Sequence, residues 1–121
     1  MKAEEYYKNG NSCSESIVKY AIDNGLCPQE FLPAATAFSA GMSSGCLCGA
    51  VAAAQMVSGF NNPAMARENA KLIVQEFKNR NKITCCRVLS AGLEGAAKKE
   101  RCSKYVADAQ EILESVLKVK A

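Results

Sequence analysis

The sequence contains no histidine and no tryptophan, and only three of its 121 residues are proline. Without histidine the chain cannot form a Ser-His-Asp or Cys-His catalytic centre, an imidazole proton shuttle or a histidine-ligated metal site. It also lacks an uninterrupted apolar run of about 18 residues, so we expect no membrane insertion. These absences exclude the familiar acyl-transfer enzymes and every metal centre that needs an imidazole ligand.

Charge is modest overall and absent from the middle of the chain. The 15 basic and 12 acidic residues give a formal net charge of +3, which is too small to indicate a nucleic-acid partner. Residues 31–66 contain no Asp, Glu, Lys or Arg, and half of them are Ala, Gly or Ser. We interpret this uncharged segment as the closely packed centre of the fold.

Local patterns favour helices from end to end, and no segment alternates with a period of two. Ser12 and Glu15 form a capping-box pattern that predicts a helix beginning at Cys13 and ending near Gly25. Asn62-Pro63 predicts the start of a helix that runs to Asn81, in which Glu76 and Arg80 are spaced to pair.

Three further helices complete the prediction. One begins beside Cys48, a short one covers residues 85–91, and a long last one carries Cys102 and the apolar residues that follow it. We therefore expect residues 1–121 to form one all-α domain, a compact bundle of about five or six helices.

Cysteine is the residue type that the chain has in excess, with seven at positions 13, 27, 46, 48, 85, 86 and 102. Residues 1–10 carry early acids and no apolar run, which predicts a cytoplasmic protein without a secretory signal. Cytoplasmic thiols are kept reduced, so the cysteines indicate metal or redox use more than a disulfide framework. The odd count and the uncharged segment also favour a homodimer.

Several cysteines coincide with expected helix starts. Cys13, Cys48 and Cys86 fall in or beside first turns, and Cys102 lies early in the last helix. Helix N-termini carry unsatisfied N–H donors and partial positive charge, which stabilise thiolates and anionic ligands. Four such ends could converge on one site. The alternative is that each thiol is a small hydrophobe in an alanine-rich core.

The spacing of the cysteines does not identify a metal, because no pair of C-x2-C motifs is present. Soft thiolates in a histidine-free chain select zinc, copper(I) or an iron–sulfur cluster. Cys46 and Cys48 are close enough in sequence to chelate together, whereas Cys85-Cys86 could form an easily reduced vicinal disulfide. Cys46 and Cys85 are therefore additional candidate ligands, and Cys27 has no assigned role.

The motifs together resemble the C_GCAxxG_C_C family of redox-active proteins over most of the chain. The resemblance rests on residues 11–16 (NSCSES), residues 40–50 (AGMSSGCLCGA), residues 86–89 (CRVL) and Cys102. The family's four cysteines correspond to Cys13, Cys48, Cys86 and Cys102, and Gly49 and Ala50 match its Cys-Gly-Ala-x-x-Gly motif. The last glycine of that motif is replaced by Ala53 here.

The resemblance implies a small helical domain with a redox or metal-binding cysteine site; a similar domain that accompanies haem modules looks like an iron–sulfur carrier. Haem itself is not expected, because the chain has no C-x-x-C-H pattern. We expect Cys13, Cys48, Cys86 and Cys102, with Gly49 beside them, to hold an iron–sulfur cluster that passes electrons to a redox partner protein.

Two other hypotheses use the same residues. In a metal-free dithiol switch, Cys86 or Cys48 is the attacking thiol and Cys85, Cys46 or Cys102 resolves the disulfide. In the second, the cysteines form a structural zinc site. We therefore favour an electron-transfer or metal-binding protein over an enzyme that converts a substrate.

Overall fold

The computed structural model describes residues 2–37, 47–82, 89, 92 and 94–117. Within these residues it has six α-helices, a 3-10 turn and no strand, which confirms the all-α prediction. The elements are α1 (Ala3–Lys8), α2 (Cys13–Asp23), α3 (Phe31–Ala37), α4 (Gly49–Asn61), η2 (Pro63–Met65), α5 (Ala66–Asn81) and α7 (Gly95–Leu117). The short helix predicted over residues 85–91 lies outside the described residues except at Leu89.

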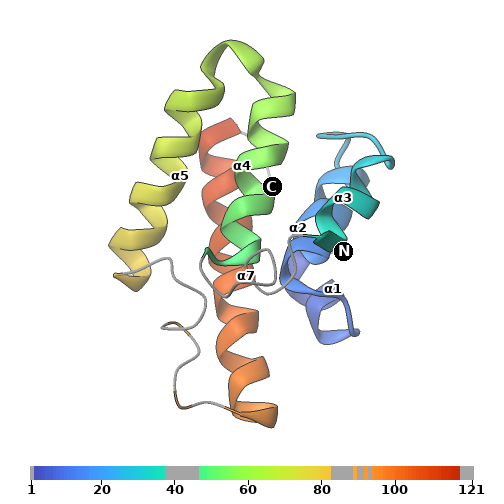
Figure 1. Ribbon diagram of the computed structural model, residues 1–121, viewed down its shortest axis with the longest axis vertical. Coiled ribbons are helices and arrows are strands. Elements are labelled where there is room, and N and C mark those ends of the chain that lie inside the picture. The colour runs from blue at the N-terminus through green and yellow to red at the C-terminus, as the bar shows by residue number, and fades with distance from the viewer. Residues whose placement is uncertain (1, 38–46, 83–88, 90–91, 93, 118–121) are drawn as a thin grey trace.

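Helix α4 is the centre of the bundle and packs against α2, α5 and α7 (Figure 1). It comes from the uncharged segment, and its buried side chains are small: Gly49, Ala50, Val51, Ala53, Ala54, Val57 and Ser58. Small side chains allow neighbouring helices to approach closely on several sides. The prediction that this segment forms the centre of the fold therefore holds for α4, but not for α3, which comes from the same segment and buries only Ala35.

Helix α2 begins and ends where its local signals predict. Ser12 Oγ accepts a hydrogen bond from the Glu15 N–H at 3.2 Å, and Glu15 Oε1 accepts one from the Ser12 N–H at 2.9 Å. Gly25 has a φ of +71°, a left-handed conformation that suits glycine and stops the helix. This capping box makes Cys13 the first residue of α2.

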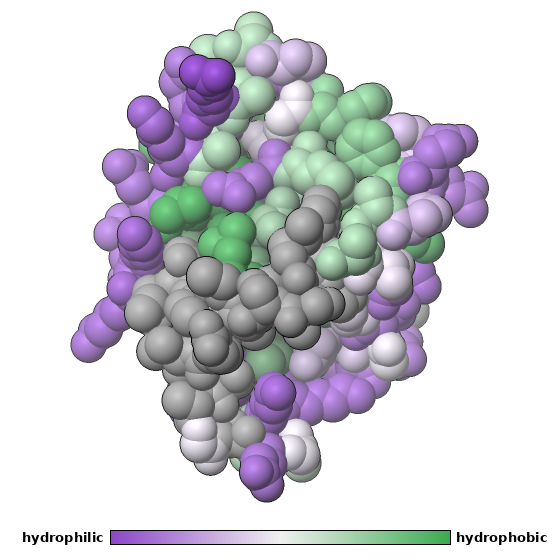
Figure 2. All heavy atoms as spheres, in the orientation of Figure 1, coloured by the Kyte–Doolittle hydropathy of each residue, from purple (hydrophilic) through white to green (hydrophobic). Residues whose placement is uncertain are grey.

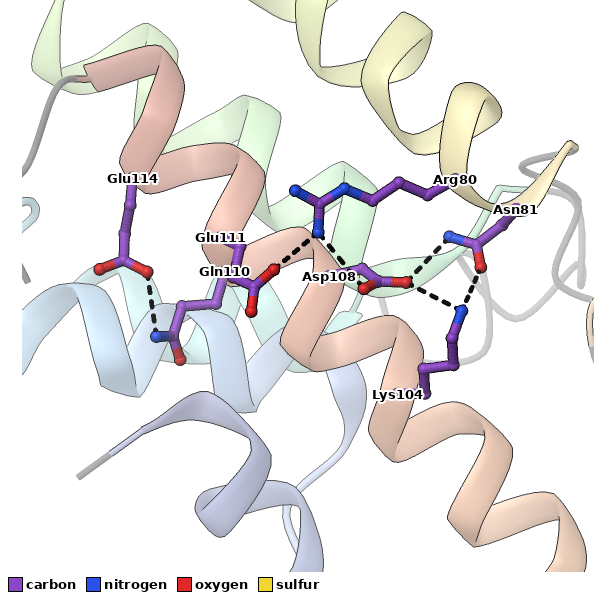
Figure 3. A network of polar contacts seen from close by, with 7 residues as sticks. All are labelled: Arg80, Asn81, Lys104, Asp108, Gln110, Glu111 and Glu114. Atoms are coloured by element: carbon purple, nitrogen blue, oxygen red, sulfur yellow. Dashed lines mark hydrogen bonds and ion pairs between the residues drawn. The ribbon is translucent and has the colours of Figure 1, made fainter.

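The start of α5 differs from its prediction. Pro63 opens a 3-10 turn, and the α-helix begins at Ala66. At its other end, Arg80 Nη1 donates to Glu111 Oε1 at 2.7 Å and to Asp108 Oδ1 at 3.4 Å, in the network drawn in Figure 3. Arg80, which sequence spacing pairs with Glu76, thus links α5 to α7.

Apolar side chains also reach the surface. Figure 2 shows them gathered on the upper part of the face drawn there, with hydrophilic side chains around its edges. Phe60, at the end of α4, is 51% exposed and meets the ring of Phe31 edge-on, with centroids 4.7 Å apart. Among the described helices, none is both long enough and apolar enough to cross a membrane.

Candidate cysteine site

Two cysteines occupy the helix starts predicted for them. Cys13 is the first residue of α2, and Cys48 is the N-cap residue of α4, only 5% exposed. Gly49 follows Cys48 as the buried first residue of α4. Backbone N–H groups of these helix ends, and their partial positive charge, favour negative charge on sulfur at both positions.

Cys102 lies early in the last helix, as predicted, but not at its start. With Gly95 as the first residue of α7, Cys102 is the eighth, about two turns into the helix. Its sulfur therefore does not share the N-terminal environment of Cys13 and Cys48. Cys46, Cys85 and Cys86 lie outside the described residues.

Three of the cysteines assigned to the site lie near enough to Tyr7 of α1 for their charge to act on its hydroxyl group. Burial raises the pKa of Tyr7 above its ordinary value. Its hydroxyl donates a hydrogen bond to Cys102, and negative charge on Cys102, Cys13 and Cys48 raises that pKa further. The fold therefore brings cysteines from α2, α7 and the start of α4 into one region. Two of them, Cys13 and Cys102, are 89 positions apart in the sequence.

Helix α1, which carries Tyr7, is held at both ends. Near its start, the Ala3 N–H donates to Gln110 Oε1 at 2.7 Å, and Ser103 Oγ donates to Glu4 Oε2 at 3.2 Å. At its end, Asn11 donates to the Tyr6 carbonyl from its side-chain amide at 3.0 Å and from its backbone N–H at 3.2 Å. The bonds to Gln110 and Ser103 fix α1 against α7, next to Cys102, and the Asn11 bonds close the end of α1.

A cleft of about 450 Å³ lies on the surface beside Tyr7. Its other lining residues come from the turn before α2, the first turns of α2 and the beginning of α7: Gly10, Asn11, Ser12, Glu15, Gly95, Lys98 and Lys99. None of these described lining residues is a cysteine. Tyr7 therefore lines the cleft and also interacts with the cysteines.

The donor set fits a soft-metal centre, although not one built from the described residues alone. Within the described part of the chain, no three cysteine or carboxylate side chains are placed to share a metal ion. Thiolates around a single tetrahedral zinc would lie within about 4 Å of one another, given Zn–S bonds of about 2.3 Å. An iron–sulfur cluster distributes its thiolates over several iron atoms, so it accepts more widely spaced sulfurs.

Cys27, unlike the other three described cysteines, is not among the residues that act on Tyr7. It is 7% exposed within the apolar core, and burial raises its pKa to about 11. At neutral pH it is therefore a protonated thiol. For this cysteine, the interpretation as a small core hydrophobe accounts for what the structure shows.

Sequence reasoning missed Tyr7 as a member of the site. The two adjacent tyrosines of α1 differ only in the direction they face: Tyr6 donates to Asp23 Oδ2 of α2 at 2.5 Å, whereas Tyr7 donates to Cys102 of α7. The sequence signal was only a pair of aromatic residues in a short helix. Which of them reaches a thiol depends on tertiary packing.

Comparison with known families identifies one match. A family model described as "Putative redox-active protein (C_GCAxxG_C_C)" matches residues 11–116. The match includes Cys13, Cys48, Cys86 and Cys102 and begins after Tyr7. Neither the curated proteins nor the solved structures include a similar chain.

Proposed function

Since the chain belongs to the C_GCAxxG_C_C family of redox-active proteins, we propose that it carries single electrons on an iron–sulfur cluster bound by Cys13, Cys48, Cys86 and Cys102. One observation carries the proposal: three of these cysteines, from distant parts of the chain, interact electrostatically with Tyr7. Hydrophobic packing alone does not require three thiols to lie near one polar group, since a buried thiol packs equally well beside carbon.

The helix ends supply what an anionic centre needs. Cys13 and Cys48 stand at the starts of α2 and α4, both of which exceed ten residues, so their N-terminal N–H groups can stabilise negative charge on sulfur. Burial of Cys48 and Gly49 limits the access of water. Hydrogen bonds to sulfur and exclusion of solvent are two of the factors that set the reduction potential of a cluster.

When bound, such a cluster supplies reversible one-electron transfer in which no ligand bond is broken. The electron donor and acceptor in this proposal are redox partner proteins. A reducing compartment such as the cytoplasm suits the proposal, because it keeps cysteines available as ligands.

A metal-free dithiol switch is the second candidate function, favoured by the same proximity of Cys13, Cys48 and Cys102 to one hydroxyl. In that reaction two thiols form a disulfide, and two electrons and two protons pass to a disulfide of a partner protein. The reverse reaction consumes a dithiol of the same partner class.

Iron and acid-labile sulfide analysis, with a visible spectrum, tests the proposal on protein purified without oxygen. We expect iron and sulfide in near-equal amounts and a brown chromophore. Cys48→Ala should lose the chromophore, whereas Cys27→Ala should keep it; the pair is well matched, because the two side chains are 5% and 7% exposed. Colourless, iron-free protein would overturn the cluster, and reversible loss of two thiols on oxidation would then support the switch.

A further inference from the structure

We propose that the surface around Lys8, Lys98 and Lys99 is the docking site for an acidic electron-transfer protein, which exchanges electrons with the redox centre. The inference rests on the proposed electron-transfer function and adds the chemistry of the partner. In each transfer the reduced centre loses one electron and the oxidised partner gains it.

The site lies where the candidate redox centre reaches the surface. Of the three described cysteines assigned to the centre, Cys48 is only 5% exposed, whereas Cys13 and Cys102 are half-buried. Cys13 is the first residue of α2, and Cys102 belongs to α7. A partner that exchanges electrons with the centre therefore approaches it between the start of α2 and the early turns of α7.

Two lysines lie on the same face of α7 as Cys102, one turn nearer the helix start. Lys98 and Lys99 precede Cys102 by four and three residues, and side chains with these spacings are neighbours on a helix. Tyr105, which follows on this face, is buried, whereas residues 94–101 are all exposed. Figure 1 shows the first turns of α7 extending past the ends of α4 and α5. The two lysines thus stand where the face that carries Cys102 leaves the core.

Two surface clefts lie beside these lysines. The cleft of about 450 Å³ is lined by Lys98 and Lys99 of α7 and by Ser12, which caps α2. A second cleft, of about 270 Å³, is lined by Lys8 at the end of α1 and again by Lys99. Because Lys99 lines both clefts, the three lysines belong to one surface, formed by α1, α7 and the turn before α2.

This surface has an excess of positive charge. Residues 94–101 carry three basic and two acidic side chains, and Lys8 adds a fourth basic one. Glu15 also lines the larger cleft, but its carboxylate already accepts hydrogen bonds from the Ser12 N–H and the Thr36 hydroxyl. None of the three lysines forms an ion pair with another residue that the structure describes. Unpaired positive charge attracts a negatively charged partner and speeds its association.

The extent of the surface fits a protein better than a single small anion. Its lysines come from two helices and are divided between two clefts, so one anionic group cannot contact all of them. Electron-transfer proteins form small, short-lived interfaces, typically below about 1,200 Å² in total. In a contact of that size a few lysines decide which partner binds.

Binding to oxidised plant-type ferredoxin, a strongly acidic [2Fe–2S] electron-transfer protein, tests the proposal. Basic cytochrome c is the probe of opposite charge. We expect the purified full-length protein to bind ferredoxin at an ionic strength of about 0.02 M, and more weakly as salt rises to about 0.2 M. We expect no comparable binding of cytochrome c. Isothermal titration calorimetry measures both.

A pair of double variants separates the docking site from net charge. Lys98→Glu/Lys99→Glu should weaken ferredoxin binding by about tenfold or more. Lys71→Glu/Lys78→Glu makes the same change of net charge at two exposed lysines of α5 and should weaken it by less than about threefold. Glutamates are favourable near the start of a helix, so the α7 variant should keep its fold, which circular dichroism checks.

Equal weakening in the two double variants would overturn the docking site, because net charge alone would then account for binding. Failure of ferredoxin to bind, or tighter binding of cytochrome c, would also overturn it. Iron and sulfide are determined on the same preparations. Their absence overturns the cluster but does not alter the binding comparison, so the failure of the proposed function and the failure of the docking site are distinguishable.

Discussion

Gln110 Oε1 accepts a hydrogen bond from the Ala3 N–H at 2.7 Å, although the two residues are 107 positions apart in the sequence. Ala3 is fully buried and Gln110 is 6% exposed, so water cannot replace this bond without an opening of the structure. The bond joins the first helix of the chain to the last. It is therefore part of what holds Tyr7 beside Cys102.

Gln110→Ala should lower the free energy of unfolding by about 1–3 kcal/mol, because it leaves a buried N–H without its acceptor. Urea unfolding measures the change. Glu100→Ala, at an exposed position on the same helix, is the control and should change stability by less than about 0.5 kcal/mol. Equal stability of the two variants would contradict the anchoring role of Gln110.

Features that depend on neighbouring residues could be predicted from the sequence. The Ser12–Glu15 capping box and the positive φ of Gly25 are decided within a few residues, and both were found where predicted. Such local reasoning does not predict contacts between helices, and Arg80 is an example. Spacing within α5 pairs it with Glu76, but its bonds to Asp108 and Glu111 come from the packing of α5 on α7.

Sequence reasoning predicted which residues belong to the site better than it predicted how they are arranged. The motif pointed to Cys13, Cys48 and Cys102, all of which interact with Tyr7, but Cys102 lies about two turns beyond the start of its helix. The reason is physical: residues 94–101 are all exposed, so the first two turns of α7 contribute nothing to an apolar stripe. Hydrophobic periodicity detects only the part of a helix that is buried.

The charge of Glu15 should make stability depend on pH. Its hydrogen bond from the Ser12 N–H, and then that from the Thr36 hydroxyl, lower the pKa of this carboxyl in the folded state. A lowered folded pKa gives a stabilisation that is complete above the unfolded pKa, about 4.3, and is lost as pH falls through the folded value.

Glu15→Gln should therefore be less stable than wild type at neutral pH by about 0.3–1 kcal/mol, since a carboxylate also favours a helix N-terminus. The difference should disappear toward about pH 3. Urea unfolding of both proteins across this range measures it. A difference that stays constant with pH would show that the charge of Glu15 is not responsible.

Cys27 should be the least reactive of the cysteines that the structure describes. With a pKa of about 11, its labelling by iodoacetamide at neutral pH should be slow in the folded protein and should still rise with pH above about 9. Peptide mass spectrometry measures it against Cys102, which is half-buried. Equal labelling rates for Cys27 and Cys102 in the folded protein would contradict the assignment of Cys27 to the core. Denatured protein is the control, because there the two labelling rates should converge.

Two substitutions in α4 should have opposite effects on stability. Ala53 is fully buried where the family motif has glycine, so Ala53→Gly removes a packed methyl group and loosens the helix backbone, at a cost of about 1 kcal/mol or more. Gly59 has room for a methyl group: an added Cβ would meet the Ala66 Cβ at 3.7 Å, an ordinary contact. Gly59→Ala should therefore stabilise the protein by about 0.5–1 kcal/mol, because it restricts the unfolded backbone.

Thermal unfolding of both variants, each with the wild type in the same run, measures this contrast. A gain in stability for Ala53→Gly would show that the methyl group is strained against α2, α5 or α7, and that the glycine of the motif serves close packing. A loss at Ala53 with a gain at Gly59 would show instead that this chain has adapted its helix spacing to alanine. In that case α4, which Cys48 caps, is positioned by packing particular to this sequence.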